Sequence, residues 1–213
     1  MKRYVSNKDE SERMFENKFL EFFSHVHPAT PAIIFLPVIG YMMYETVVTE
    51  VNFASAFFLF ILGLFVWSFT EYVLHRFIFH LVPKSEWGKQ IHFMFHGVHH
   101  DYPNDSTRLV MVPIVSIPLS TFFYFLFRGI VGGHYVPPFF AGFMIGYLIY
   151  DLSHYAFHHF SLHGRAALYL KQQHMRHHYM DPDGNYGVST PFWDFVFGTY
   201  MKKPQQVSVP SQQ

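Results

Sequence analysis

The stretch FASAFFLFILGLFVWSFTEYVLHRFIFH, residues 53–80, begins as an apolar run and ends in two histidines. As one helix it would be about 42 Å long at 1.5 Å per residue, whereas the hydrocarbon core of a bilayer is about 30 Å thick. The helix must then extend beyond the bilayer and carry His75 and His80 just above its surface. This stretch therefore predicts a membrane protein with histidines at the membrane surface.

Four stretches contain no Asp, Glu, Lys or Arg: residues 30–44, 53–70, 109–127 and 129–150. A span needs about 20 mostly apolar residues, so these stretches predict about four transmembrane helices, the first with Glu45 at the interface. The fourth is expected to run from Pro137, a favourable first helical position, through His159. Pro113 and Pro118 are expected to kink the third, with a packing role as the alternative.

Positive charge is distributed unevenly between the two sides that four crossings define. Residues 1–28, 71–108 and 151–213 share one side and hold fourteen of the fifteen Lys and Arg, which leaves Arg128 alone on the other. Such a bias is typical of segments retained in the cytosol. The sequence therefore predicts an all-α integral membrane protein with a cytosolic, histidine-rich helical cap. Its expected parts are a cytosolic or interfacial N-terminal segment, a membrane domain and a polar C-terminal tail, at residues 1–28, 29–201 and 202–213.

The composition excludes several classes of function. Half of the residues are hydrophobic, 14% are charged and the formal net charge is zero. A neutral, aromatic-rich chain of this kind is a poor candidate for binding nucleic acid. The chain has no cysteine, which excludes disulfides, cysteine-based zinc fingers and iron–sulfur clusters. Any bound metal must therefore be held by nitrogen and oxygen ligands.

Eleven of the sixteen histidines form four tight boxes: His75 and His80; His96, His99 and His100; His154, His158 and His159; and His174, His177 and His178. Neutral imidazole is the commonest protein metal ligand, and packing does not ask for histidines in such groups. The boxes therefore predict a metal site on the shared side of the membrane. Ordinary hydrogen-bonded residues are expected at the lone histidines His25, His27, His134 and His163.

Spacing within the boxes indicates how many metals they hold. Residues three or four apart share a helix face, so His154 pairs with His158, and the second and fourth boxes each offer such a pair. Adjacent helical residues point about 100° apart, so the three His-His doublets each offer imidazoles in two directions, which predicts two metals. His75 and His80 would diverge by about 140° on an ideal helix. They either serve different metals or lie on a distorted helix.

Other metal chemistries fit the boxes less well. Haem takes only one or two axial histidines, far fewer than the boxes contain. A transporter would place ligands near the bilayer midplane, often with Asp or Glu, and the predicted spans contain neither. A membrane metal-binding protein with a structural zinc site is the non-enzymatic alternative.

The first 28 residues carry scattered charges of both signs, and no cleavable signal peptide is apparent. Residues 7–10 resemble a capping box, which predicts a helix that starts there and carries Phe15, Phe19, Phe22 and Phe23 on one side. We expect this helix to lie in the membrane interface, with an ordinary packed helix as the alternative.

Four segments resemble one known family: HRFIFH (75–80), HFMFHGVHHDYPNDSTRLVMVP (92–113), YDLSHYAFHH (150–159), and HMRHHY (174–179) together with NYGVSTPFWDFVFGT (185–199). Their histidine order resembles the integral-membrane fatty acid hydroxylase superfamily, whose relatives include sterol desaturases and carotenoid hydroxylases. The residues around the histidines resemble the fatty acid 2-hydroxylases within it. The resemblance covers about residues 60–200.

The resemblance implies a dimetal centre at the cytosolic membrane face, held by ten histidines: His75, His80, His96, His99, His100, His154, His158, His174, His177 and His178. It implies an accessory place for His92 and His159. Orientation of the imidazoles or lining of the substrate entrance is expected of Asp101, Tyr102, Asn104, Asp105 and Arg108, with solvated loop residues as the alternative. Trp193 and Asp194 are expected to pack and cap the cytosolic lid.

The activity that the resemblance implies is O2-dependent hydroxylation of carbon 2 of a long acyl chain, in a free fatty acid or in a ceramide. Two iron ions are the expected cofactors of this monooxygenase, and zinc is able to replace them during purification. The alternative within the superfamily is a desaturase or oxidase acting on a sterol or another lipid. The membrane would be the endoplasmic reticulum in a eukaryote and the inner membrane in a bacterium.

The electron donor is expected to be a separate protein. Eukaryotic 2-hydroxylases typically carry a cytochrome b5-like domain with a His-Pro-Gly-Gly haem motif, and this sequence does not contain that motif. Besides the lipid substrate and the membrane, the expected partner is therefore a cytochrome b5-like protein or a ferredoxin with its reductase.

Overall fold

Helices account for all regular secondary structure in residues 4–202, the part of the chain that the computed structural model describes. In chain order they are α1 (Lys18–Ser24), α2 (Thr30–Val48), α3 (Phe53–Val73), η1 (Leu74–Phe79), α4 (Glu86–His92), η2 (Phe93–Gly97), α5 (Val98–Asp101), α6 (Pro113–Val131), α7 (Val136–His159), α8 (Arg165–Tyr179) and α9 (Phe192–Val196). The element η1 is the π-helical C-terminal end of the helix that begins as α3, and η2 is a π-helical turn between α4 and α5 in one continuous helix. The predicted all-α fold is confirmed, and the predicted tail lies almost wholly outside the described residues.

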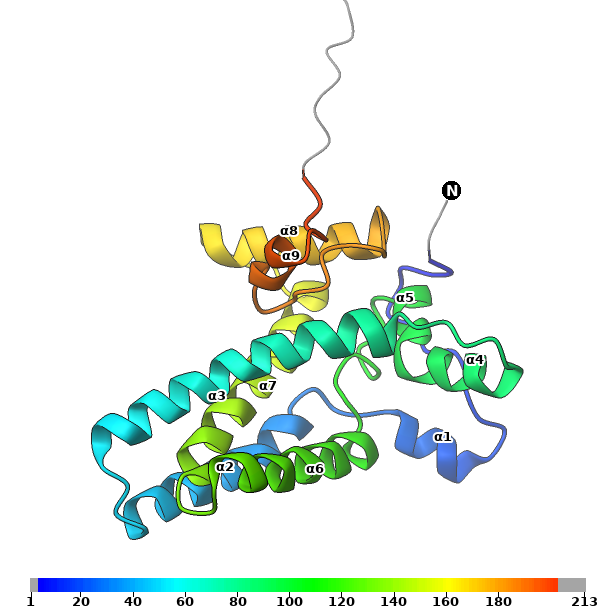
Figure 1. Ribbon diagram of the computed structural model, residues 1–213. Coiled ribbons are helices and arrows are strands. Elements are labelled where there is room, and N and C mark those ends of the chain that lie inside the picture. Colours follow the sequence, from blue (N-terminus) through cyan, green and yellow to red (C-terminus); the bar gives the residue numbers. More distant parts are fainter. Residues whose placement is uncertain (1–3, 203–213) are drawn as a thin grey trace, which may run out of the picture.

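Four helices are long and apolar enough to cross a membrane: Thr30–Val48, Phe53–Phe79, Pro113–Val131 and Val136–His159. They confirm the predicted number of spans. The second has 27 residues, or about 40 Å of helix, so its last turns extend beyond a 30 Å core. In Figure 1, α4 and α5 lie at this end of α3, and α8 and α9 lie together at the end of α7.

The third span begins later than its apolar run suggested. Its helix starts at Pro113, which therefore lies in the first turn, where a missing N–H breaks no helical hydrogen bond. The predicted kink at this residue is wrong for that reason. Pro118 lies inside the helix.

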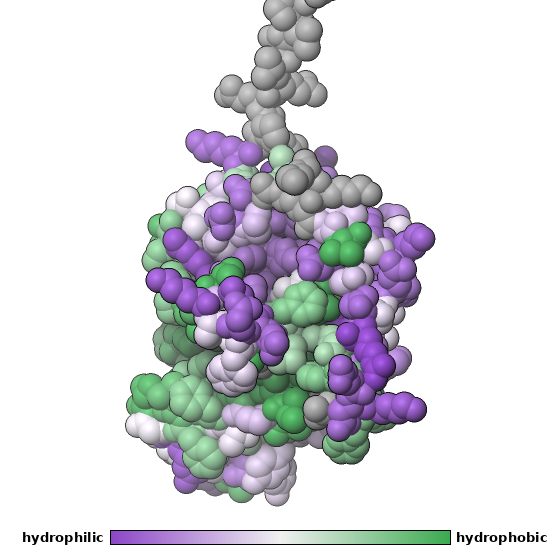
Figure 2. Space-filling view, turned by 90° about the vertical axis from the view of Figure 1, so that its right-hand side faces the viewer, coloured by the Kyte–Doolittle hydropathy of each residue, from purple (hydrophilic) through white to green (hydrophobic). Residues whose placement is uncertain are grey.

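The helix α7 lies at the centre of the bundle. Its first half, from Val136 to Met144, is buried throughout. On α3, by contrast, Phe57, Phe58 and Phe65 are large exposed side chains. Figure 2 shows such hydrophobic residues gathered on the lower half of one face and hydrophilic residues on its upper half. An apolar surface of this kind suits contact with lipid.

The contact between α3 and α7 is closest at three glycines. A Cβ added at Gly63 would overlap the backbone of α7, and one at Gly142 would overlap the carbonyl oxygen of Phe60. A Cβ at Gly146 would lie 2.6 Å from the Cβ of Trp67, which is also too close. Gly142 and Gly146 are four residues apart, the small-xxx-small pattern that lets two membrane helices approach closely.

The N-terminal segment does not form the helix predicted from residue 7. Helix α1 begins only at Lys18, and residues 4–17 form an N-terminal strap that lies beside α5 in Figure 1. The Val5 N–H donates to the Asp101 carbonyl at 2.9 Å, and the Asp9 carboxylate accepts from the Ser106 N–H at 2.9 Å. The Asn7 side chain, which would cap the predicted helix, instead accepts from the Tyr179 hydroxyl at 2.7 Å, so it does not cap a helix at that place.

Replacing Gly142 by leucine is expected to destabilise the fold, because the new side chain must displace the backbone of α3. Overpacking a core typically costs about 1–3 kcal/mol, and backbone overlap places this variant at or above the upper end. Thermal unfolding in detergent would measure the loss. The matched control is Gly40→Leu in α2, since a Cβ at Gly40 meets nothing within 4 Å. Equal unfolding midpoints for the two variants would contradict the prediction.

Candidate metal centre

A π-helical turn decides how the first box is presented. The His80 N–H donates to the His75 carbonyl at 3.2 Å, an i to i+5 bond in place of the α-helical i to i+4 bond. This wider turn brings residues five apart toward the same face of the helix. Of the two alternatives left open by the spacing, the structure shows the distorted helix, and both histidines face the same cluster.

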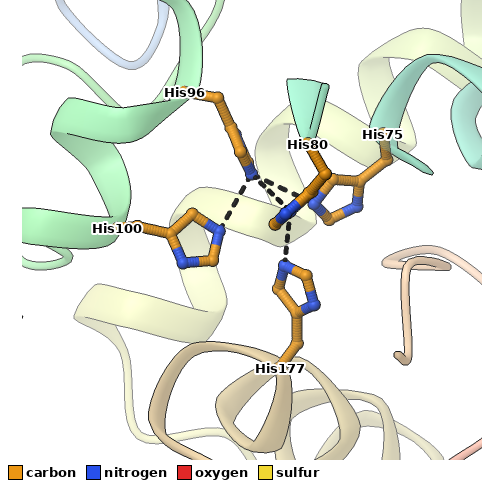
Figure 3. Close-up of side chains that lie close together, drawn as sticks. All are labelled: His75, His80, His96, His100 and His177. Carbon is orange, nitrogen blue, oxygen red and sulfur yellow. Dashed lines mark hydrogen bonds between the residues drawn. The ribbon is translucent and has the colours of Figure 1, made fainter. Parts of the chain in front are cut away.

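Five imidazoles form the first histidine group: His75, His80, His96, His100 and His177. Figure 3 shows their rings pointing toward one another from η1, from the helix of the second box and from α8. The Nε2 atom of His96 lies 2.9 Å from that of His100, 3.0 Å from that of His80 and 3.2 Å from that of His75. Nitrogen ligands about 2.1 Å from one ion, at angles of 90–109°, would lie roughly 3.0–3.4 Å apart. The group therefore fits a shared metal ion.

Five more imidazoles form the second histidine group: His99, His154, His158, His174 and His178. Their candidate ligand atoms all lie within 4.8 Å of one another, and the Nε2 atoms of His158 and His174 are 2.9 Å apart. Both ring nitrogens of His99 and of His178 are buried without a hydrogen-bond partner. Buried polar atoms normally have partners, and a metal ion bound by the facing nitrogens would supply one.

Two of the three doublets divide between the groups, as their spacing predicted. His99 and His100 belong to different groups, and so do His177 and His178. The groups are therefore adjacent, and the rings of His100 and His178 stack with centroids 4.3 Å apart. The third doublet does not divide, because the His159 ring stacks instead on Tyr155 with centroids 4.5 Å apart.

The polar residues after the second box contact the N-terminal segment. The Asp105 carboxylate accepts from the Ser11 hydroxyl at 2.6 Å, and the Asn104 amide donates to the Asn7 carbonyl at 2.9 Å. In the same way, Tyr102 bonds to Glu12 and Arg108 to Glu21. The half-buried Asp101 holds the strap through its backbone carbonyl. No hydrogen bond of these side chains in residues 4–202 reaches either histidine group, so an effect on the imidazoles remains a prediction.

The accessory and lone histidines lie outside both groups. His92 is half-buried and lies near His80, whose pKa is lowered first by burial and then by repulsion from His92. His25 bonds to Thr107 at 2.7 Å and to Glu21 at 3.2 Å, which is the ordinary hydrogen-bonded role expected of it.

The loop of residues 184–189 is a part of the site that the sequence did not reveal. Its Tyr186 carbonyl accepts from the His75 Nδ1–H at 2.5 Å, and its Gly184 carbonyl accepts from the His177 Nδ1–H at 2.8 Å. The loop is bonded in turn to Asp194 and Glu71. The only signal for Glu71 was its position, one helical turn before His75 at the end of an apolar run.

Burial keeps the imidazoles neutral. It lowers the pKa of His80 to about 4 and moves the pKa values of His100, His174 and His178 well below the usual 6.5, because a cationic imidazole loses its hydration there. Repulsion from neighbouring imidazoles lowers them further. Neutral imidazole is the form that binds a metal, so both groups suit metal binding near pH 7.

The metal-free protein is expected to lose stability as the pH falls from about 6.5 toward 4. In this window the unfolded chain binds protons on its histidines, whereas the folded chain keeps imidazoles such as His80 neutral down to about pH 4. Proton uptake by the unfolded state lowers the free energy of unfolding. Chemical denaturation at several pH values would measure it. Metal-loaded protein is the control and should lose stability at lower pH, since metal and protons compete. A free energy of unfolding that rises on acidification would contradict the prediction.

Known proteins resemble this chain over most of its length. Residues 60–199, which include all four boxes, match the fatty acid hydroxylase family. Dihydroceramide fatty acyl 2-hydroxylase FAH1 of Arabidopsis thaliana is 35% identical over 190 residues, covering 89% of this chain and 80% of the relative. Fatty acid 2-hydroxylase of Mus musculus is 35% identical over 208 residues, covering 88% of this chain and 56% of the relative.

A solved structure agrees with the sequence comparisons. Full-length Scs7p, in which only the hydroxylase domain is visible, matches with a TM-score of 0.83 and 38% sequence identity, covering 88% of this chain and 71% of that one. The family match includes the last two membrane-crossing helices and most of the second. The chain therefore belongs to the fatty acid hydroxylase family and is a membrane hydroxylase, an oxidoreductase of the monooxygenase type.

Proposed function

We propose that this protein hydroxylates carbon 2 of long acyl chains, using O2 and a dimetal centre held by the two histidine groups. The observation that carries the proposal is the arrangement of ten imidazoles in two adjacent groups of five, at the ends of membrane-crossing helices. The names of the relatives, fatty acid 2-hydroxylase and dihydroceramide fatty acyl 2-hydroxylase, support carbon 2 and an acyl substrate. A free fatty acid and a ceramide are both compatible with these names.

The ligand set favours iron. Imidazole nitrogens with no cysteine suit non-haem iron, and zinc fits the same nitrogens when it replaces iron during expression. Bound iron would supply the O2 chemistry that cleaves an unactivated C–H bond, which no side chain can perform. The chain itself keeps the imidazoles neutral, excludes water by burying most of them, and holds the two groups next to each other.

A groove along α3 and α7 offers a place for the acyl tail. Its volume is about 410 Å³, within the roughly 300–1,000 Å³ of ligand pockets. Ile61, Phe65 and Ile149 line it and are also exposed on the surface that faces lipid. Ser189 also lines the groove, and its N–H donates to the Glu71 carboxylate at 2.9 Å. Glu71 in turn lies one helical turn before His75. A tail in this groove would place its head group beside the metal centre.

The depth of the site in the membrane favours carbon 2. Each histidine group includes residues at the end of a membrane-crossing helix, where that helix would leave a bilayer. This is also the level expected of a lipid head group and its carbonyl. The carbon next to the carbonyl then lies nearest the metals, while mid-chain carbons lie deeper in the groove. This geometry supports 2-hydroxylation over mid-chain desaturation.

We also propose that the histidine groups face the cytosol and receive electrons from a separate protein. The bias of positive charge supports this orientation, and the sequence contains no haem, flavin or thiol motif that could store electrons. The donor would be a cytochrome b5-like protein or a ferredoxin with its reductase. Attraction of an acidic donor is provided by exposed side chains of the cap, among them Lys8, Arg13, Lys84, Lys89 and Arg165.

Purified protein in lipid, supplied with O2, a long acyl substrate and a reduced donor, is expected to form 2-hydroxy product over many turnovers, detected by mass spectrometry. His99→Ala and His178→Ala should each abolish the reaction, because each removes an imidazole from the second histidine group. His134→Ala should remain fully active, since His134 is exposed and lies outside both groups.

Elemental analysis of the same preparations is expected to give two ions per chain. One ion or none would contradict the dimetal centre, whereas zinc in place of iron would not. Full activity in either box variant would remove the basis for the ligand assignment. Sustained turnover without any donor or reductant would refute the proposed electron supply.

Filling the groove is expected to impair the hydroxylation of long acyl substrates. Ile149→Trp adds bulk to the groove lining, so kcat/KM for a long acyl substrate should fall by about tenfold or more, with the metal content unchanged. The matched control is Ile114→Trp, because Ile114 is exposed on α6 and does not line the groove. Equal activity of the two variants would place the acyl tail elsewhere.

A further inference from the structure

The 184–189 loop fixes the orientation of two imidazoles in the first histidine group. A carbonyl oxygen can only accept a hydrogen bond, so the Nδ1 atoms of His75 and His177 must carry the proton. Each Nε2 atom is then left with its lone pair, and these are the atoms that point into the group. The loop therefore selects the tautomer that a metal ion requires.

Two buried carboxylates hold this loop by four consecutive backbone N–H groups. Asp194 is fully buried and accepts from the N–H groups of Tyr186 and Gly187, both at 2.9 Å. Glu71 is 3% exposed and accepts from the N–H groups of Val188 at 2.7 Å and of Ser189 at 2.9 Å. Each side chain accepts two of these four bonds, so together they hold the backbone of the loop at four successive residues.

The loop is also fixed on the side of α8. Asn185 adopts a positive φ of 54°, a conformation that asparagine tolerates better than most residues. Its side-chain amide donates to the Gln173 Oε1 atom at 2.9 Å, and its Oδ1 atom accepts from the Met201 N–H at 2.9 Å. The loop is thus bonded to α3, α8 and α9, and its two carbonyls have little freedom to move.

The second histidine group lacks support of this kind. The Nδ1 atoms of four of its imidazoles are buried and have no hydrogen-bond partner among the described residues: those of His99, His158, His174 and His178. Only His154 lies beside a backbone carbonyl, that of Leu109, whereas the Tyr186 and Gly184 carbonyls of one anchored loop each accept from an imidazole of the first group. The two groups therefore present imidazoles that are ordered to different degrees.

We propose that Glu71 and Asp194 are positioning residues which, through the 184–189 loop, make the first histidine group the tighter of two unequal metal sites. This inference rests on the proposed dimetal centre. Partners of ligand imidazoles typically change metal affinity by about 10–100-fold. A difference of that size would let the first group keep its ion under conditions that empty the second.

A pair of variants at Glu71 tests the role of the carboxylate. Glu71→Leu removes both acceptors, whereas Glu71→Gln keeps one side-chain oxygen that can accept from Val188 and Ser189. Each protein is loaded with Fe(II), exposed to a mild chelator and subjected to elemental analysis. Wild type and Glu71→Gln should hold their first-group ion equally well, and Glu71→Leu should bind it about 10–100-fold more weakly. Rescue by glutamine would separate this role from mere filling of space.

Removal of one group at a time identifies the affected ion. In the Glu71→Leu background, adding His178→Ala should leave the protein almost without metal, while adding His177→Ala should leave the second-group ion as tightly bound as in His177→Ala alone. General misfolding would instead release both ions. Two ions of unchanged affinity in Glu71→Leu, or equal weakening of both, would overturn the positioning role.

If Glu71→Leu does not fold, the proposal can be tested with single histidine variants in which Glu71 is unchanged. His177→Ala protein holds an ion only in the second group, and His178→Ala protein only in an intact first group. A chelator should remove the ion from His177→Ala protein at least about tenfold faster than it removes the ion from His178→Ala protein. Equal rates, or the reverse order, would overturn the inequality of the sites. Fewer than two ions in wild-type protein would instead refute the dimetal centre itself.

Discussion

The direct contact between the backbones of α3 and α7 is the constraint on which the metal centre depends. Lipid tails are as apolar as the side chains they touch, so close packing has to hold two membrane helices together. At Gly63, Gly142 and Gly146 a single added carbon would force the helices apart. His75 and His154 lie on these two helices, beyond the contact. The close approach of the two helices at these glycines thus limits how far apart His75 and His154 can be.

The ten imidazoles, seven of them buried, place a demand on this packing. In each group nitrogen lone pairs and N–H bonds come close together, and in the second group several nitrogens have no hydrogen-bond partner among residues 4–202. Such an arrangement is unfavourable without a cation. The helix packing must therefore hold the imidazoles in place without a metal. A bound metal would add its binding free energy to the stability of the fold, which would link folding to metal affinity.

Features that repeat along the sequence could be predicted. Apolar runs and the spacing of histidines indicated four spans and the boxes, because both depend on local periodicity. The π-helical turn at His75 and His80 could not be predicted, since a spacing of five residues suits either a distorted helix or two imidazoles that bind different metals. The Gly142-Phe-Met-Ile-Gly146 pattern was a usable signal for helix contact. Partners far apart in sequence gave no local signal: Asp9 with Ser106, and Glu71 with Val188.

The order in which the histidines occur along the chain has a consequence for biosynthesis. Four of the five imidazoles of the first group lie within residues 75–100, before the third span, and only His177 comes later. In the second group only His99 comes early, and the other four lie on α7 and α8. A nascent chain can therefore assemble most of one site once its first two spans are inserted. The other site is complete only after nearly the whole polypeptide has been made.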